Sequence, residues 1–167
     1  NKVSDYDVVI VGFGPTGGTL ANLLALSNIS TCIIEREDSL YNLPRAVHFD
    51  DEVMRVFQTI GIAKNLRKYL IINRGTRFID KSGQILLDWP RPRKITINGW
   101  NASYRFHQPD LERILRRRLR NKKFIEVFKN VELQNIIEQD SNVKTTFRNL
   151  KNGTLTTVIS KYVVGCD

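Results

Sequence analysis

The hydrophobic pattern of the first 35 residues predicts a strand, a helix and a second strand. Residues 6–11, YDVVIV, form a short β-branched run that is apolar from Val8 onward, which is typical of a strand buried on both faces. Residues 31–34, TCII, have the same character and end at Glu35. Residues 19–28 lie between the two runs and carry apolar side chains that can pack as one face of a helix. The three segments make a βαβ unit, in which the strands are parallel and the crossover is right-handed.

The pattern after this unit predicts further helices and then a mainly antiparallel region. Apolar positions at helical spacing indicate a helix over residues 50–60, whose acidic first turn suits the helix dipole. Lys-Ser-Gly at 81–83 predicts a hairpin, and Asn-Gly at 152–153 predicts a tight turn within a three-stranded meander. We also expect Asp110 to cap a basic helix. The remaining expected elements are a short helix at 63–69 and strands at 76–80, 84–89, 124–128, 131–137, 144–150, 154–159 and 161–164.

The composition is that of a globular domain. Apolar residues make up 41% and charged residues 26% of the 167 residues, which excludes a disordered chain. No apolar run reaches the roughly 18 residues that a membrane-spanning helix needs. The N-terminus lacks the features of a signal peptide, although a first residue other than Met leaves a removed leader open. Cys32 and Cys166 lie in apolar, strand-like segments, so we expect buried thiols in a reducing, cytoplasmic location.

The net charge of +9 arises largely from one helical segment. Apolar residues form a stripe along this segment, so we interpret its basic residues as the solvated face of an amphipathic helix. Contact with an acidic part of the same protein is the alternative. Neither interleaved aromatic residues nor a known motif supports nucleic-acid binding. The basic residues are Arg113, Arg116, Arg117, Arg118, Arg120, Lys122 and Lys123.

The sequence Gly12-Phe13-Gly14-Pro15-Thr16-Gly17 matches the dinucleotide-binding pattern G-x-G-x-x-G. The first glycine allows a tight turn, the second lets the backbone approach a pyrophosphate, and the third lets the helix pack closely on the strand. The motif follows a buried strand and opens a helix, whose N-terminal N–H groups suit phosphate. Glu35 lies 18 residues after the third glycine, the place of a carboxylate that binds the ribose. Arg36 follows it and faces either a nucleotide phosphate or solvent.

The later segments favour FAD over NAD as the dinucleotide, because the chain continues with a hairpin and a meander rather than with more βα units. The sequence resembles the flavin-dependent aromatic hydroxylases of the p-hydroxybenzoate hydroxylase type. The resemblance runs from Asp7 to Asp167 and rests on VVIVGFGPTGGTLAN, PRAVHFDDEVMRVFQTIGI, FHQPDLERIL and VVGCD. The second and third of these segments, in this order, are the more specific.

The resemblance implies roles for residues of the cofactor site. Gly12, Gly14, Thr16 and Gly17 would hold the FAD pyrophosphate, and Glu35 would bind the adenosine ribose.

Further positions in the chain match other cofactor contacts of the family. Arg45 corresponds to an arginine beside the flavin and its phosphates, and Gln108 to a glutamine that contacts FAD. Val131 falls where the backbone meets the adenine. Asp167 matches the aspartate of an Asp-Gly motif that serves FAD and nicotinamide cofactor binding.

The resemblance also implies the organisation of the chain. The expected fold class is α/β: a Rossmann-like FAD/NAD(P)-binding domain with an antiparallel β-meander and the start of a substrate-domain β-sheet. We assign residues 1–75 and 102–167 to the FAD-binding domain and residues 76–101 to the beginning of the substrate-binding domain. Both domains are expected to be incomplete, as in the N-terminal part of a longer enzyme, because the Asp-Gly motif stops at Asp167. Unpaired strand edges would then favour association, which leaves a homo-oligomer open.

The activity implied by the resemblance is hydroxylation of a phenolic acid, such as 3-(3-hydroxyphenyl)propionate, with FAD, NAD(P)H and O2. The flavin carries the chemistry in such enzymes, so we name no catalytic side chain. His48 and Asp50 lack a third metal ligand, so we expect no metal site. Two alternatives remain: another FAD-dependent oxidoreductase, such as a halogenase or dehydrogenase, which would lack PRAVHFDDE, and a non-catalytic nucleotide-binding module.

Overall fold

The computed structural model of the chain describes residues 5–167, which fall into two compact units. The first unit contains the residues up to Asn42 together with Glu112–Asp167, and the second contains Leu43–Leu111. The division falls within helix α4 (Gln108–Leu119), so the two ends of that helix belong to different units.

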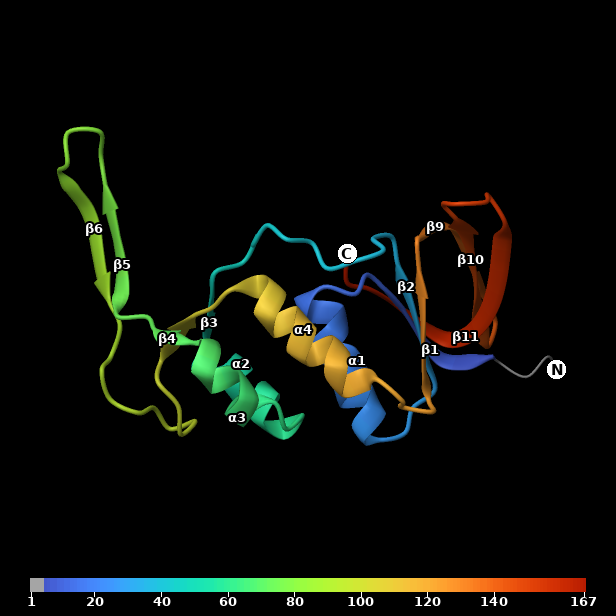
Figure 1. The fold of residues 1–167 in the computed structure, drawn as a ribbon, viewed down its shortest axis with the longest axis horizontal. Helices are drawn as coiled ribbons and strands as arrows, with labels where there is room; N and C mark the ends of the chain where they lie inside the picture. Colours follow the sequence, from blue (N-terminus) through green and yellow to red (C-terminus); the bar gives the residue numbers. More distant parts are fainter. Residues whose placement is uncertain (1–4) are drawn as a thin grey trace. The chain divides into compact units, whose positions relative to one another are not determined.

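A six-stranded sheet forms the centre of the first unit (Figure 1), with the strand order β8-β2-β1-β11-β10-β9. Strand β1 is parallel to β2 and β11, and β2 is parallel to β8. Strand β10 is antiparallel to both β11 and β9. Strand β11 therefore joins a parallel half of the sheet to an antiparallel meander. The strands are β1 (Tyr6–Val11), β2 (Thr31–Glu35), β8 (Ile125–Lys129), β9 (Val131–Gln139), β10 (Asn142–Asn149) and β11 (Leu155–Gly165).

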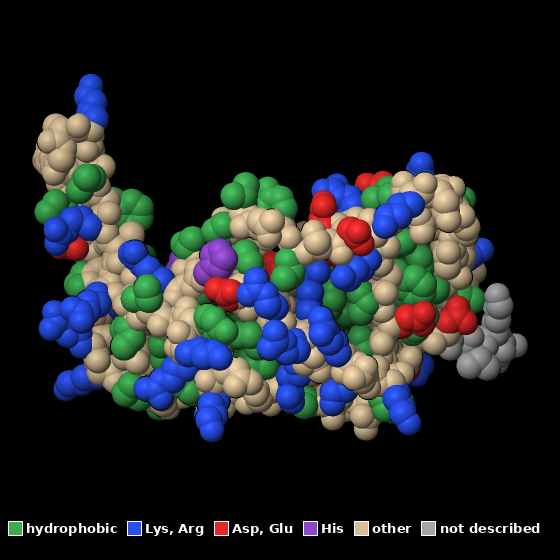
Figure 2. Space-filling view, in the orientation of Figure 1, with side chains coloured by type: hydrophobic (Ala, Val, Ile, Leu, Met, Phe, Trp, Pro, Cys, Tyr) green, Lys and Arg blue, Asp and Glu red, His purple; other side chains and the backbone are tan. Residues whose placement is uncertain are grey.

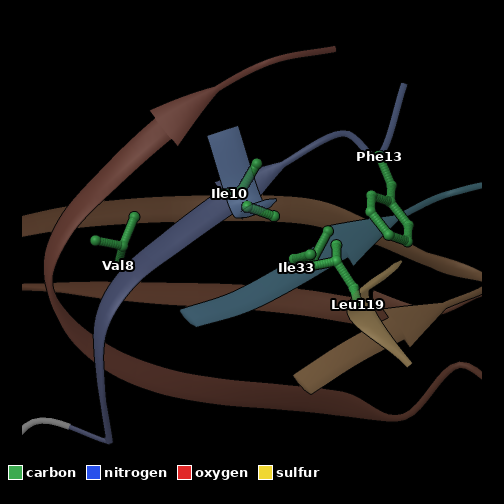
Figure 3. Close-up of a cluster of buried hydrophobic side chains, with 6 residues drawn as sticks. Val8, Ile10, Phe13, Ile33 and Leu119 are labelled. Carbon is green, nitrogen blue, oxygen red and sulfur yellow. The ribbon is translucent and has the colours of Figure 1, made fainter. Parts of the chain in front are cut away.

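Alternate side chains of β1 point to opposite sides of the sheet and are buried on both. Val8 and Ile10 belong to one buried cluster, together with Phe13, Ile33 and Leu119 (Figure 3). Burying a side chain of this size removes apolar surface from water and contributes about 1.5–3 kcal/mol. This cluster therefore fixes the strand that leads into the glycine motif.

Helix α1 (Pro15–Leu26) packs against the same cluster through Ala21, which is fully buried. In a second cluster, Val9 packs with Phe147 and Val158 of the meander. Both faces of β1 are thus covered, which explains why its sequence is continuously apolar rather than alternating.

The second unit holds a three-stranded antiparallel sheet of order β3-β7-β4, a separate hairpin and short helices (Figure 1). Phe49 of β3 packs edge-on against Phe57, with ring centroids 5.1 Å apart, and also contacts Tyr104 and Phe106. This aromatic cluster joins the sheet to helix α2. The elements are β3 (His48–Asp50), α2 (Asp51–Thr59), α3 (Ala63–Leu66), the 3-10 helix η1 (Arg67–Tyr69), β4 (Ile71–Ile72), β5 (Gly75–Ile79), β6 (Ile85–Pro90) and β7 (Ser103–Arg105).

The α/β class, the βαβ unit, the 76–89 hairpin and the meander that the sequence predicts are confirmed. Helix α1 begins earlier than expected, at Pro15, because the fixed φ of proline suits the first helical position. The strands expected at 154–159 and 161–164 are one strand, since Ser160 is paired on both of its sides.

Three short strands were not predicted from the sequence, and one further expectation about local structure needs correction. Strands β3, β4 and β7 contain only two or three residues each, which is too short for a period of two to stand out in the sequence. Helix α4 begins at Gln108, so Asp110 lies within its first turn and does not cap it from outside. No helix within residues 5–167 combines the length and apolar character that crossing a membrane requires.

Candidate functional site

The glycine motif forms the turn between β1 and α1, and two of its glycines cannot be replaced without a clash. Gly12 has a φ of +101°, and a Cβ atom there would lie 2.7 Å from the carbonyl carbon of Cys166. A Cβ atom on Gly17 would lie only 2.0 Å from the carbonyl oxygen of Gly12. Gly12 therefore permits the turn, and Gly17 permits the close approach of helix and strand.

Gly14 differs from these two glycines because the space beside it is open. A Cβ atom there would meet nothing within 4 Å. Gly14 is the N-cap of α1, and the first turn of the helix carries no acidic residue. Thr16 lies exposed in that turn. Unpaired N–H groups, the positive end of the helix dipole and an uncovered backbone together fit a pyrophosphate.

Glu35 ends strand β2 and turns its carboxylate toward the glycine motif. Its side chain is 11% exposed. Oε2 accepts a hydrogen bond from the backbone N–H of Phe13 at 2.8 Å, and Oε1 accepts one from the N–H of Glu37 at 2.8 Å. A carboxylate has about four acceptor positions, so these two bonds leave others for ribose hydroxyls. The structure thus brings Glu35 and the glycine motif together within the first unit.

Arg116 also lies beside the glycine motif and Glu35, and the sequence interpretation missed it. Its Nη2 donates to the carbonyl oxygen of Phe13 at 2.8 Å and to Oε2 of Glu112 at 3.2 Å, and it lies 3.9 Å from Oε2 of Glu35. Its guanidinium lies over the Phe13 ring, 4.6 Å from the centroid. The solvated-face interpretation is therefore wrong for Arg116, whose side chain is only 14% exposed.

The other arginines of this helix follow the expectation. Arg113, Arg117 and Arg118 are exposed. The signal that could have separated Arg116 from them is its spacing: Glu112 lies four residues earlier, and such pairs meet on one face of a helix.

Arg45 and Gln108 lie together in the second unit. Oε1 of Gln108 accepts hydrogen bonds from the backbone N–H groups of Arg45 at 2.8 Å and Ala46 at 2.9 Å. Gln108 is 3% exposed, whereas Arg45 is exposed. The buried amide thus fixes the backbone of the Pro-Arg-Ala segment and leaves the surface of Arg45 accessible.

The last three residues that the sequence singled out lie in the first unit. Asp167 is next to the glycine motif, because the N–H of Cys166 donates to the carbonyl oxygen of Val11 at 2.7 Å. Val131 is 4% exposed and packs in the core, so its side chain is not available to a ligand. Arg36 is exposed and lies 3.6 Å from Oε1 of Glu37.

The thiols offer no reactive group. Both cysteines are free, and burial raises the pKa of Cys32 to about 12. Burial also raises the pKa of Cys166. A thiol, rather than the thiolate that acts as nucleophile, is therefore present at neutral pH. Among residues 5–167, no three His, Cys, Asp or Glu side chains gather as a metal site.

Comparison with known proteins agrees with this geometry. The FAD binding domain family matches residues 5–167. The chain is 36% identical to a probable NADH-specific resorcinol 4-hydroxylase of Rhodococcus jostii (strain RHA1), over 96% of this chain and 30% of that protein. It is 35% identical to a 3-(3-hydroxy-phenyl)propionate/3-hydroxycinnamic acid hydroxylase of Mycolicibacterium vanbaalenii, over 97% of this chain and 27% of that protein.

A solved structure shows the same fold. The flavin-dependent monooxygenase PieE, solved in complex with FAD and substrate, superposes with a TM-score of 0.83 at 20% identity, over 99% of this chain and 31% of that one. The chain thus spans about three tenths of the length of these proteins. The family match covers residues 5–167 and includes the glycine motif, so the chain belongs to the FAD binding domain family.

Proposed function

We propose that the protein carrying this chain is an FAD-dependent monooxygenase that hydroxylates a phenolic acid, with NAD(P)H as reductant and O2 as oxygen donor. In this proposal residues 5–167 bind the adenosine and pyrophosphate part of FAD. One observation carries the proposal. The uncovered backbone at Gly14 and the carboxylate of Glu35 lie at the same glycine turn, within one unit. When bound, the flavin supplies the redox chemistry, and the chain positions it.

The residues of the first unit would divide the work of binding. The N-terminus of α1 would receive the pyrophosphate, since the Gly14 backbone is uncovered. Glu35 would accept hydrogen bonds from the ribose hydroxyls. The backbone of Val131 would face the adenine. Asp167, next to the glycine motif, would lie near the FAD phosphates or the nicotinamide cofactor.

Arg45 and Gln108 would act from the second unit. Gln108 holds the backbone N–H groups of Arg45 and Ala46, which limits the positions that the Arg45 side chain can reach. An arginine can pair two phosphate oxygens at once, so the exposed Arg45 suits a phosphate group of FAD or of the reductant. Arg36 would meet the same class of group at the end of β2.

The choice of substrate rests on the relatives. The two hydroxylases compared above are named for phenols, and one of the two for phenols that carry a carboxylate. The net charge of +9 suits anionic substrates in general. A phenolic acid therefore fits best. The free cysteines suit a reducing, cytoplasmic location.

The test is oxidation of NADH and of NADPH by the full-length protein with FAD, scanned over resorcinol, 3-(3-hydroxyphenyl)propionate and other phenols. We expect one phenol to stimulate oxidation and to yield a product with one added oxygen. A halogenated product formed when halide is present, or a dehydrogenated product formed without consumption of NAD(P)H, would replace the hydroxylase with another flavin oxidoreductase. Binding of FAD with no turnover under any condition would favour a nucleotide-binding module.

A further inference from the structure

Glu35 reaches the glycine motif with a carboxylate that is held from more than one side. The N–H of Phe13 donates to its Oε2, and the N–H of Glu37 donates to its Oε1. A carboxylate that selects a ribose by hydrogen bonds must keep a fixed orientation, because such bonds weaken steeply when they are misaligned. The orientation of Glu35 thus depends on where the Phe13 backbone lies.

Arg116 fixes the same residue from its other side. The N–H of Phe13 is bound to Glu35, while the carbonyl oxygen of Phe13 accepts from Arg116 at 2.8 Å. The guanidinium also covers the Phe13 ring at 4.6 Å. It lies between two carboxylates, those of Glu112 at 3.2 Å and Glu35 at 3.9 Å. The Arg116 side chain therefore fixes the Phe13 backbone, whose N–H orients Glu35, and also places a positive charge beside the Glu35 carboxylate.

The backbone that carries Arg116 is itself locked to α1. Leu115 is fully buried, and its Cβ lies 3.4 Å from where a Cβ atom of Gly18 would be. The buried Asn22 donates to the carbonyl oxygens of Gly18 at 2.8 Å and Leu115 at 3.1 Å. A Cβ atom on Gly18 would already be in van der Waals contact with Leu115, so the two helices pack closely at this point. Arg116, one residue after this contact, is thereby placed relative to the N-terminus of α1.

The arrangement is not one that stability alone explains. Burying an arginine between carboxylates costs desolvation that the ion pairs only partly repay. The Nε atom of Arg116 is buried and has no hydrogen-bond partner among residues 5–167, which is a further cost. Apolar residues of similar volume would stabilise such a helix contact at least as well.

We infer that Arg116 is a positioning residue of the cofactor site, which aligns Glu35 and Phe13 so that the carboxylate distinguishes a nucleotide with a free adenosine ribose 2′-hydroxyl from one without it. The inference rests on the proposed FAD site. Arg116 acts through Glu35. Its loss therefore lowers the preference for the ribose hydroxyl, whereas a merely structural residue would lower affinity for both nucleotides alike.

The experiment uses the full-length protein freed of FAD and titrates it with FAD and with an FAD analogue that lacks the adenosine 2′-hydroxyl. Flavin fluorescence reports the two dissociation constants. The wild-type protein is expected to prefer FAD by about tenfold or more, the size of one hydrogen bond to a charged group. Glu35→Gln and Arg116→Gln are each expected to bring this ratio down to within about twofold of unity. Arg116→Lys keeps the charge but not the planar fork, so an intermediate ratio is expected. The control is Arg117→Gln, an exposed neighbour whose removal is expected to leave the ratio unchanged.

The possible outcomes separate this inference from the proposed function. A wild-type preference that depends on Glu35 but survives in Arg116→Gln overturns the inference and leaves the FAD site standing. A wild-type protein that binds both nucleotides equally removes Glu35 from the ribose and overturns the inference as well. A wild-type protein that binds neither nucleotide overturns the proposed function itself. If Arg116→Gln does not fold, Arg116→Lys decides, because an unchanged ratio in that variant contradicts the positioning role.

Discussion

The glycine turn after β1 in the first unit and the turn of the β5–β6 hairpin in the second unit both contain a glycine at a positive φ, yet they differ in what surrounds them. Around the turn, Ile10 is fully buried and Phe13 is 4% exposed. In the hairpin, Leu86 is 67% and Trp89 54% exposed, and Figure 2 shows apolar and basic side chains side by side along it. The first region is stabilised by its own core. The second presents apolar side chains outward, which is typical of an interaction surface.

This difference bears on function. The turn is shaped in detail by buried neighbours, so it can hold a ligand to a narrow geometry. Apart from Gly75, the hairpin falls within residues 76–101, which we assigned to the beginning of a substrate-binding domain. That assignment remains a prediction. An apolar outward surface is what a strand pair would carry if further parts of a longer protein packed on it.

Truncating one apolar side chain in each region gives the largest expected contrast. Ile10→Ala should destabilise the full-length protein by about 4 kcal/mol, since it leaves a cavity in a closed cluster. Leu86→Ala truncates a side chain that is 67% exposed, so it should cost less than about 0.5 kcal/mol. Urea unfolding measures both values. A cost above about 2 kcal/mol for Leu86→Ala would show that the hairpin is covered in the full-length protein.

Adding one methyl group to a glycine gives the next contrast. Gly17→Ala places a Cβ atom 2.0 Å from the carbonyl oxygen of Gly12, so we expect a loss of about 3 kcal/mol or more in the free energy of unfolding. Gly83→Ala in the hairpin meets no atom within 4 Å and pays only for its φ of +86°, about 1–2 kcal/mol. Equal losses in the two variants would contradict the close packing of α1 on β1.

Gly14→Ala separates binding from stability within the glycine turn. Its Cβ atom would meet nothing within 4 Å, and its φ of −78° is ordinary for alanine. The free energy of unfolding should therefore fall by less than about 1 kcal/mol. Affinity for FAD should fall about tenfold or more, since the methyl group would occupy the side from which the pyrophosphate approaches. Titration of the FAD-free protein measures this, and an unchanged affinity would place the pyrophosphate elsewhere.

Cys32 provides the last contrast, which depends on pH. Burial raises the pKa of its thiol from 9.0 to about 12. Above pH 9 the unfolded chain loses this proton and the folded chain keeps it, so the contribution to stability falls as the pH rises toward 12. Cys32→Val removes this group. We measure the free energy of unfolding with urea at pH 8 and at pH 10.5. Between these two pH values it should fall less in Cys32→Val than in the wild-type protein. An equal fall in the two proteins would contradict the raised pKa.

The parts of the molecule that could be predicted from sequence are those that local pattern encodes. The βαβ unit follows from two continuously apolar runs, and the spacing from Gly17 to Glu35 places a carboxylate at the end of the second strand. The structure shows why this works: Glu35 reaches the turn because parallel neighbouring strands end at the same edge. Both features depend on interactions between segments close in the chain.

The remaining features depend on tertiary contacts that no local pattern carries. Arg116 looks like its exposed neighbours in sequence, and only the position of α4 against the glycine motif buries it. Gln108 holds the backbone of Arg45 across 63 residues of chain. Ser160 and Lys161 interrupt an apolar run, which suggested two separate strands. In the structure Ser160 pairs with β1 on one side and with β10 on the other, so the segment is one strand.

The most direct test of the central claim compares FAD with FMN, which lacks the adenosine monophosphate half that residues 5–167 would bind. Equilibrium titration of the FAD-free, full-length protein with each flavin gives the two dissociation constants. The account predicts that FAD binds at least about a hundredfold more tightly, a difference of about 2.8 kcal/mol. Equal affinities would contradict it, because the glycine turn and Glu35 would then contribute nothing to flavin binding.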